Sequence, residues 1–119
     1  MKKHSIFYVI LLFALLFTSC DKTATIQVTN NVHNVRLDNI NFDKFGIGSH
    51  IITGESTQQV EISTQDNVSF PLSAQLQFYM VKGDTRVFLK TKEIYTLNED
   101  AKLIIVINDD TEVVNISTD

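Results

Sequence analysis

Apolar and polar residues alternate with a period of two through most of the chain after residue 20. Ala24, Ile26 and Val28 are separated by single polar residues, and so are Val60 and Ile62. Successive side chains of a β-strand point to opposite faces, so this alternation predicts strands with one buried face. Asparagine, aspartate and glycine recur between these segments, as they do in turns. The chain is therefore expected to fold as an all-β protein.

The clearest strand pair is a hairpin over residues 74–92, with Gly83 and Asp84 at its tip. Glycine and aspartate suit a tight turn, and a turn there fixes which residues lie opposite each other. One face carries apolar pairs and is assigned to the core: Met80 with Val87 and Phe78 with Leu89. The opposite face carries an aromatic pair among polar ones: Tyr79 with Phe88, Gln77 with Lys90, Gln75 with Lys92, and Val81 with Arg86.

Other segments depart from simple alternation. The apolar parity changes after Asn39, which predicts a bulge at residues 38–39. Pro71, the single proline, predicts an edge strand or a crossing between sheets, because proline cannot donate to a strand ladder. Residues 103–107 are apolar at every position, so we expect a central strand covered on both faces. Turns are expected at residues 30–34, 53–56, 98–100 and 108–111.

Eight or so short strands, without a convincing helix after residue 20, predict a two-sheet antiparallel sandwich. The sandwich is expected to be of immunoglobulin-like or transthyretin-like type, although the tryptophan and cysteine pair of antibody domains is missing. A small closed β-barrel is the alternative. Residues 23–119 are long enough for one such domain with a single core.

The first nineteen residues have the composition of an export signal. Lys2 and Lys3 precede an apolar run, residues 6–17, that is shorter than the ~20 residues of a membrane helix. The following Thr18-Ser19-Cys20 resembles the lipobox of bacterial lipoproteins. The resemblance implies a signal peptide over 1–19, acyl chains such as palmitate on Cys20, and a short tether over 20–22. An ordinary secretory signal or a short membrane helix is the alternative.

The net charge and the single cysteine limit the classes of binding partner and the covalent links that we expect. Without Lys2 and Lys3 the chain carries eight basic and fourteen acidic side chains, a formal charge of −6. Nucleic acids and anionic lipid headgroups require clustered cations, so no nucleic-acid partner is expected. The single cysteine leaves no possibility of a disulfide within the chain. Contact with a membrane is expected through the lipid on Cys20.

No sequence motif indicates catalysis. Ser49 precedes His50, but neighbours on a strand point to opposite faces, and no serine lies in a nucleophile-elbow motif. Gly46 and Gly48 are not followed by a predicted helix whose N-terminus would bind phosphate. The Lys82-Gly83-Asp84 tripeptide resembles one that some integrin ligands display, but good turn chemistry explains it as well. We expect a non-enzymatic protein without a cofactor.

Metal binding is not expected either. The calcium-type oxygen donors that are closest in sequence lie in one predicted turn: Asn108, Asp109, Asp110 and Glu112. They lack the spacing and the glycine of an EF-hand loop, and turn chemistry explains the same residues. A zinc site from His33 and His50 would require the fold to bring them together.

The outward face of the hairpin is the candidate binding surface. Tyr79 and Phe88 are expected side by side there, and flat aromatic surface beside amide and cationic donors suits a sugar ring or an acidic peptide. The flanking donors are Gln75, Gln77, Arg86, Lys90 and Lys92. An ordinary solvated sheet face carries the same residue types, and a cross-strand aromatic pair stabilises a sheet without any ligand.

The lipobox, residues 28–31 and 39–40, Gly48 and the Thr53-Gly54-Glu55-Ser56 turn together resemble small β-sandwich, immunoglobulin-like lipoproteins of the Bacteroidetes type. The resemblance implies a lipid-anchored protein of the bacterial cell envelope, in the outer membrane, with its periplasmic or surface face left open. From the expected anchor, the absence of catalytic motifs and the sandwich pattern, we expect a binding or interaction module for a glycan or protein ligand. Alternatives are a structural accessory subunit of a surface or periplasmic assembly, and an inhibitor of a host or rival enzyme.

Overall fold

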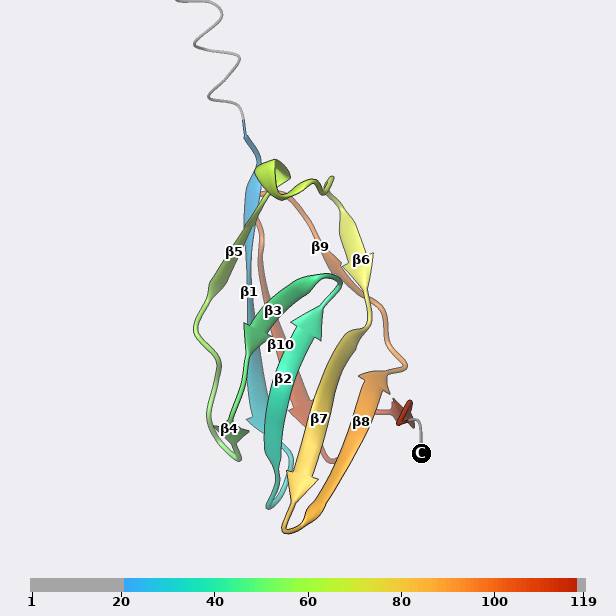
Figure 1. The fold of residues 1–119 in the computed structure, drawn as a ribbon. Coiled ribbons are helices and arrows are strands. Elements are labelled where there is room, and N and C mark those ends of the chain that lie inside the picture. Colours follow the sequence, from blue (N-terminus) through green and yellow to red (C-terminus); the bar gives the residue numbers. More distant parts are fainter. Residues whose placement is uncertain (1–20, 118–119) are drawn as a thin grey trace, which may run out of the picture.

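The computed structural model describes residues 21–117, which form two facing β-sheets and a short third one (Figure 1). The three-stranded sheet has the order β10-β1-β5, with β1 at Thr23–Asn31, β5 at Val60–Ser63 and β10 at Lys102–Asn108. The six-stranded sheet has the order β11-β8-β7-β2-β3, and β4 also pairs with β2. Its strands are β2 Arg36–Phe42, β3 Phe45–Gly48, β4 Ile51–Ile52, β7 Leu76–Lys82, β8 Thr85–Thr91 and β11 Val113–Asn115. The third sheet pairs β6, Leu72–Ala74, with β9, Tyr95–Leu97.

The all-β, sandwich-like class is confirmed, because the described residues contain eleven strands in mostly antiparallel pairs and no α-helix. The one helical element there is a 3-10 turn, η1, at Thr64–Asp66. The closed-barrel alternative is wrong, since the strands remain in separate sheets with free edges. In the constant-type immunoglobulin order the first two strands share a sheet, whereas β1 and β2 lie in different sheets here.

The core lies between the two large sheets and follows the alternation of the sequence. Every second residue of β1 is buried, and so are the inward residues of β2, β7 and β10. The largest fully buried side chains include Phe42, Phe78, Ile26 and Leu37. The period-two pattern therefore identifies the inward faces of β1, β2 and β7 correctly.

The predicted hairpin register is confirmed for the pairs from Gln77–Lys90 to Val81–Arg86. β7 and β8 pair Phe78 with Leu89, Tyr79 with Phe88 and Gln77 with Lys90, in the expected register. Gly83 at the tip has φ +59°, a left-handed conformation that glycine adopts without steric cost. The pairing of Gln75 with Lys92 is wrong, because β7 begins at Leu76 and Gln75 instead donates from Nε2 to the carbonyl of Thr91 at 3.0 Å.

The predicted bulge is also confirmed. Asn39 has φ +48°, and the register of β2 against β7 shifts between Asp38 and Asn41. Asparagine tolerates this left-handed backbone because its short amide can bond locally. The extra residue turns Ile40 and Phe42 inward after Leu37, which explains the change of apolar parity.

The prediction of a central strand at residues 103–107 is wrong. β10 is an edge strand that pairs with β1 alone, and this pairing is parallel. Ile105 and Ile107 are buried, but Ile104 is 51% exposed and Val106 is 42% exposed. An all-apolar run predicts burial on both faces only if some other element covers the second face. In residues 21–117 no strand lies on the other side of β10.

The predicted turn at residues 30–34 begins later than expected. β1 continues to Asn31, and Asn30 is fully buried in the strand. The turn itself is centred on Asn34, with φ +60°.

Pro71 precedes the short strand β6, at the passage from η1 to the two-stranded sheet, in agreement with the predicted edge position.

Candidate functional site

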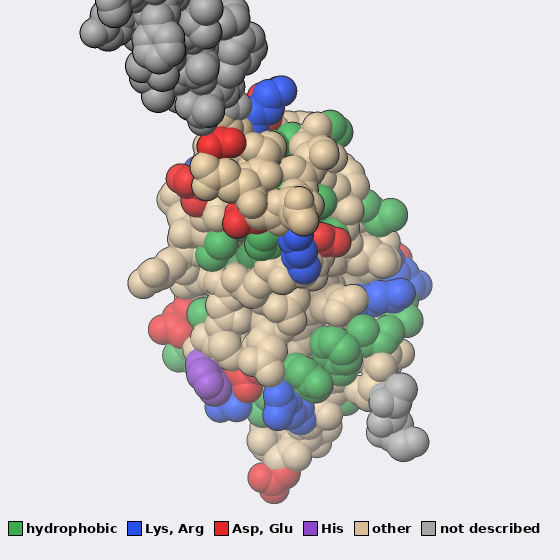
Figure 2. Space-filling model, turned by 45° about the horizontal axis from the view of Figure 1, so that its top comes forward, with side chains coloured by type: hydrophobic (Ala, Val, Ile, Leu, Met, Phe, Trp, Pro, Cys, Tyr) green, Lys and Arg blue, Asp and Glu red, His purple; other side chains and the backbone are tan. Residues whose placement is uncertain are grey.

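The candidate face is the outer surface of the six-stranded sheet over β7 and β8. Figure 2 shows hydrophobic side chains there with Lys and Arg side chains beside them. Tyr79 and Phe88 stack on each other with ring centroids 4.6 Å apart and an interplanar angle of 20°. The sequence-based expectation that these two rings lie together is therefore confirmed.

Tyr79 is enclosed by two neighbours. The guanidinium carbon of Arg86 lies 4.0 Å from the centroid of the Tyr79 ring, and Phe88 stacks on the same ring. Two groups of that size cannot share one face of a ring, so they occupy opposite faces. The cation lies over the electron-rich ring, a favourable contact. The aromatic surface left for a ligand is consequently the outer face of Phe88 and the ring edges.

A shallow groove of about 650 Å³ runs beside this pair. The two rings are part of its lining, and the other lining residues belong to β2, to β3 and to the position after β3. Its lining residues are Asn39, Ile40, Asn41, Gly46, Ile47, Gly48, Ser49, Tyr79 and Phe88, and we call this set the aromatic groove. Apolar surface on one side and amide groups on the other is the composition of a site that binds a polar ligand with an apolar face.

The polar groups of the aromatic groove are partly used within the protein. Ser49 Oγ accepts from the backbone N–H of Asn39 at 3.0 Å, and Asn41 Nδ2 donates to the carbonyl of Asn39 at 3.2 Å. The Asn39 side chain stays exposed, and that of Asn41 is half-buried. The bulge at Asn39 therefore presents two side-chain amides at the rim of the groove.

The other predicted members of the face separate into two groups. Gln77 and Lys90 lie opposite each other on β7 and β8, next to the aromatic pair. Lys92 lies instead beyond the end of β8 and forms a long ion pair with Glu112 at 3.9 Å. Gln75 is turned to the backbone of Thr91. Gln75 and Lys92 are thus removed from the predicted site.

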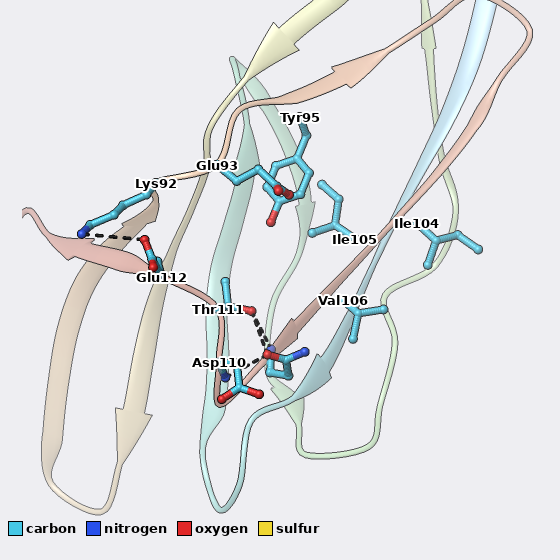
Figure 3. Close-up of a pocket in the computed structure, with 10 residues that line it drawn as sticks. Lys92, Glu93, Tyr95, Ile104, Ile105, Val106, Asp110, Thr111 and Glu112 are labelled. Atoms are coloured by element: carbon cyan, nitrogen blue, oxygen red, sulfur yellow. Dashed lines mark hydrogen bonds and ion pairs between the residues drawn. The ribbon is translucent and has the colours of Figure 1, made fainter.

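A larger hollow, about 780 Å³, lies away from this face (Figure 3). It opens between β10 and the segment that connects β8 to β9, and we call it the β10 crevice. Its lining residues are Lys92, Glu93, Tyr95, Ile104, Ile105, Val106, Asn108, Asp110, Thr111 and Glu112. Burial, and then Glu93, raise the pKa of the Tyr95 hydroxyl above its ordinary value. The apolar run of β10 is the sequence signal at this hollow, although such a run by itself predicts a strand covered on both faces.

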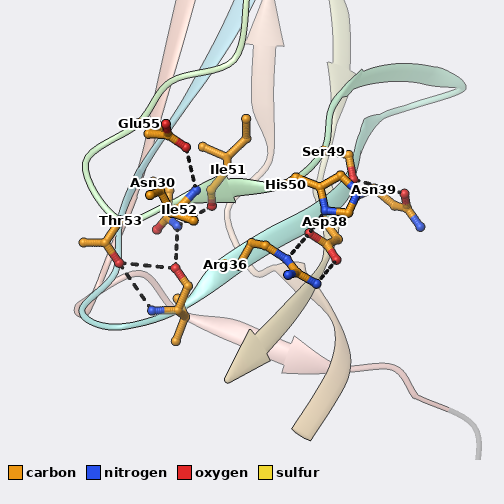
Figure 4. A network of polar contacts seen from close by, with 11 residues as sticks. Asn30, Arg36, Asp38, Asn39, Ser49, His50, Ile51, Ile52, Thr53 and Glu55 are labelled. Atoms are coloured by element: carbon orange, nitrogen blue, oxygen red, sulfur yellow. Dashed lines mark hydrogen bonds and ion pairs between the residues drawn. The ribbon is translucent and has the colours of Figure 1, made fainter. Parts of the chain in front are cut away.

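A charged cluster lies at the edge of the candidate face (Figure 4). Arg36 donates from Nε and Nη2 to the two carboxylate oxygens of Asp38 at 2.8 and 2.9 Å, and His50 Nδ1 lies 3.3 Å from Asp38 Oδ1. The hydrogen bonds from Arg36 lower the pKa of Asp38, burial opposes this, and the charges of Arg36 and His50 lower it further. The cluster fixes β2 against the turn before β4, so we assign it a structural role.

The remaining sequence candidates do not combine into a reactive site. His33 and His50 lie in different turns, and Asp109 accepts from the backbone N–H of His33 at 3.0 Å. The side chain of Asn108 accepts from the N–H of Asp110 at 2.9 Å, as expected of a turn. In residues 21–117 no group of three or more His, Cys, Asp or Glu side chains is placed to hold a metal ion.

Cys20, the predicted lipid attachment residue, and the predicted signal peptide 1–19 lie outside the described residues. The two residues that follow are held to the fold. The carbonyl of Lys22 accepts from the backbone N–H of Thr64, and the N–H of Lys22 donates to Thr64 Oγ1. The side chains of Asp21 and Gln65 are also hydrogen-bonded to each other. No helix in the described part of the chain is long and apolar enough to cross a membrane.

Sequence reasoning missed Asn39, Asn41 and Ser49 as groove residues. The available signal was the glycine-interrupted strand at residues 45–48, since glycine in a strand can mark a place where another group approaches closely. No protein-family model matches the chain, and neither a curated protein nor a solved structure was found to match it.

Proposed function

We propose that this chain is a non-enzymatic binding module of the bacterial cell envelope, anchored by lipid on Cys20, and that the aromatic groove is its binding site. The observation that carries the proposal is the continuity of the stacked Tyr79–Phe88 pair with a groove that has amide groups on its rim. The anchor is supported by the lipobox at Thr18-Ser19-Cys20.

A glycan is the ligand class that fits this groove best. A sugar ring has an apolar C–H face that packs on an aromatic side chain, while its hydroxyls both donate to and accept from amides. Asn39 and Asn41 contribute such amides to the groove lining, and Phe88 contributes an aromatic ring to it. An acidic peptide is less suited, because Arg86 is already occupied over the Tyr79 ring.

The test is glycan-array binding by the full-length chain in detergent, followed by titration of any sugar that binds. Phe88→Ala is expected to weaken binding at least about tenfold, because it removes the free stacking face. Asn41→Ala is expected to weaken it severalfold. Lys102→Ala, on the other sheet, is the matched control and should leave affinity unchanged. Equal affinity of the Phe88→Ala variant would show that the groove is not the site.

The anchor has an independent test. Mass spectrometry of the protein from membranes should show a chain that begins at Cys20 with acyl chains attached, and Cys20→Ser should release the protein from the membrane fraction. Two or three acyl chains are needed for stable anchoring, because one chain alone gives marginal binding. Protease accessibility on intact cells then distinguishes the surface face of the proposed outer membrane from the periplasmic one.

A second candidate function is a structural accessory subunit, which the unpaired edge of β10 favours.

Of the two sandwich types, we propose the transthyretin-like one, supported by the placement of β1 and β2 in different sheets.

A further inference from the structure

One edge of β10 carries backbone groups that face away from its neighbour. The N–H of Thr25 donates to the carbonyl of Ala101 at 3.0 Å, so the odd-numbered residues of β10 direct their backbone groups toward β1. The even-numbered residues must then point the other way. Asn108 confirms this, because its N–H donates to Thr111 Oγ1 at 2.9 Å on that side. The outward-facing backbone belongs to Lys102, Ile104 and Val106, and we call these three residues the free edge.

The free edge lacks the usual protection against strand pairing. Exposed edge strands are commonly blocked by proline, a bulge, an inward-pointing charge or a covering loop. Here β10 runs in regular register with β1 over seven residue pairs, and the middle of the free edge is Ile104 and Val106. Both side chains are about half exposed on the outer face of the sheet. An incoming strand would therefore gain both a hydrogen-bonding partner and an apolar surface.

The β10 crevice lies directly beside the free edge and has an acidic lining. It combines three carboxylates with one ammonium group, and Lys92 is already within 3.9 Å of Glu112 (Figure 3). Its apolar lining residues are Tyr95, Ile104, Ile105 and Val106, and its lining also includes Glu93 and Asp110. A strand placed along the free edge would point alternate side chains into this crevice. A long cationic side chain would reach its carboxylates.

A second copy of this chain is the simplest possible occupant, but the anchor argues against it. Two β10 strands paired antiparallel would place their parallel neighbours, the β1 strands, in opposite directions. A nine-residue strand is roughly 30 Å long, so the two chain starts would lie at opposite ends of the dimer. Lys22 is hydrogen-bonded to Thr64, so only Asp21 separates this fixed point of the fold from Cys20 in the sequence. This step rests on the proposed lipid anchor, because both lipids would have to enter one membrane.

We propose that the free edge of β10 binds an extended, basic and apolar segment of another protein, which adds as an antiparallel strand and directs a lysine or arginine into the β10 crevice. The backbone of Lys102, Ile104 and Val106 supplies the hydrogen bonds, in the manner of other strand-addition interfaces. In this proposal, the partner residues that pack on the exposed side chains of Ile104 and Val106 are apolar. This surface belongs to the three-stranded sheet and is distinct from the aromatic groove on the six-stranded sheet.

The probe is a labelled synthetic peptide in which valine and threonine alternate and a lysine occupies each of the first two positions. Antiparallel addition brings its first residues beside Asp110, at the end of β10. Binding to the full-length chain in detergent is measured by fluorescence anisotropy. Two control peptides have the same length: one carries N-methyl groups at alternate residues, and the other has glutamate in place of both lysines.

The informative protein variant is Ile104→Pro. Proline removes an N–H that faces away from β1, so the ladder with β1 is retained, as it is for prolines on natural edge strands. Ile104→Thr is the matched control, because it keeps the N–H and the β-branched shape. We expect Ile104→Pro and N-methylation each to weaken peptide binding about tenfold, and Ile104→Thr to weaken it less than threefold. The glutamate peptide should bind more weakly than the lysine peptide, and the difference should shrink in high salt.

Several outcomes would overturn the proposal. One is no binding of the lysine peptide up to millimolar concentration, and another is binding that neither N-methylation nor Ile104→Pro weakens. If the proline variant is unfolded by circular dichroism, the N-methylated peptide decides alone. A dimer of the unlipidated Cys20→Ala chain that Val106→Lys dissociates would identify a second copy as the occupant instead. The acyl mass on Cys20 is measured separately, so failure of the anchor is distinguishable from failure of the edge.

Discussion

The two long sides of the sandwich are built in opposite ways. On one side the chain passes from the six-stranded sheet to the three-stranded sheet, and residues 53–57 hydrogen-bond along β1. On the other side β10 and β11 are the outer strands of their sheets, and the β10 crevice opens beside β10. We call these the closed side and the open side. Buried side-chain hydrogen bonds lie on the first, and the second has an unpaired strand edge.

The closed side is held by buried polar groups (Figure 4). Asn30 is fully buried, and its Nδ2 donates to the carbonyls of Val35 and Ile51 at 3.0 and 2.8 Å. Its Oδ1 accepts from the N–H of Val32 at 2.9 Å. One amide thus joins the β1–β2 turn to β4. Hydrogen-bonded polar groups in a core stabilise one arrangement of the chain, because each alternative leaves some of them without partners.

The largest predicted effect is therefore on the closed side. Asn30→Ala removes the partner of the buried Val32 N–H and of the half-buried Ile51 carbonyl, while the Val35 carbonyl still has Thr53 Oγ1 as a donor at 3.2 Å. We expect a loss of about 3 kcal/mol in the free energy of unfolding. Asn31→Ala, one residue later and exposed, is the matched control and should change it by less than about 0.5 kcal/mol. Urea denaturation of the full-length chain measures both. Equal losses for the two variants would show that the Asn30 network does not distinguish the two sides.

A second prediction concerns the close packing of the same side. A Cβ atom on Gly48 would lie 2.7 Å from Thr57 Cγ2, whereas one on Gly46 would lie 3.7 Å from its nearest neighbour, Asn41 Oδ1. Gly48→Ala is expected to cost about 1 to 2 kcal/mol of unfolding free energy through overpacking, and Gly46→Ala less than that.

Thr57→Ser makes this prediction specific. It removes the crowding methyl group but keeps the hydroxyl, which accepts from the N–H of Val28 at 3.0 Å. The double variant Gly48→Ala/Thr57→Ser should therefore lose less stability than the sum of the single variants, and thermal melting can establish this. Strict additivity would mean that Gly48 is needed for another reason.

The third prediction is a pH dependence at the edge of the closed side. The folded protein holds the pKa of Asp38 below its ordinary value of 3.8. The ionised carboxylate therefore contributes stability above that value, and the contribution is lost as pH falls through the lower pKa of the folded state. Asp38→Asn should lower the urea midpoint at pH 7 and have little effect at pH 2. Asp43→Asn, in the exposed β2–β3 turn, should leave the midpoint unchanged at both pH values.

The sequence predicts local geometry well where the backbone conformation depends on residues of the same short segment. Gly83 fixed the hairpin register, and the parity change at Asn39 indicated a bulge, because both are signals within a few residues. Burial by distant segments leaves no such signal. The buried role of Asn30 depends on Ile51, and the apolar run 103–107 gives no indication that one of its faces stays uncovered. Strand order is a property of the whole chain.

The candidate site likewise combines a feature that a local segment predicts with features that depend on distant segments. The stacking of Tyr79 with Phe88 could be predicted from the hairpin alone. The enclosure of Tyr79 by Arg86 depends on a side-chain rotamer, and the amides of Asn39 and Asn41 come from a strand on the other side of β7. Neither could be inferred without the sheet order. The sequence therefore predicts the aromatic part of the groove but not the part that carries the amides.

The smallest effect is expected on the open side and tests whether its apolar residues serve folding. The double variant Ile104→Thr/Val106→Thr should change the free energy of unfolding by less than about 1 kcal/mol, because both side chains are about half exposed and threonine keeps the β-branched shape. Ile105→Thr, between them on the same strand, should cost about 2 to 3 kcal/mol, since Ile105 is 1% exposed. Urea denaturation compares the two. A loss for the double variant as large as that for Ile105→Thr would assign Ile104 and Val106 to the stability of the sheet and remove the reason to expect a partner there.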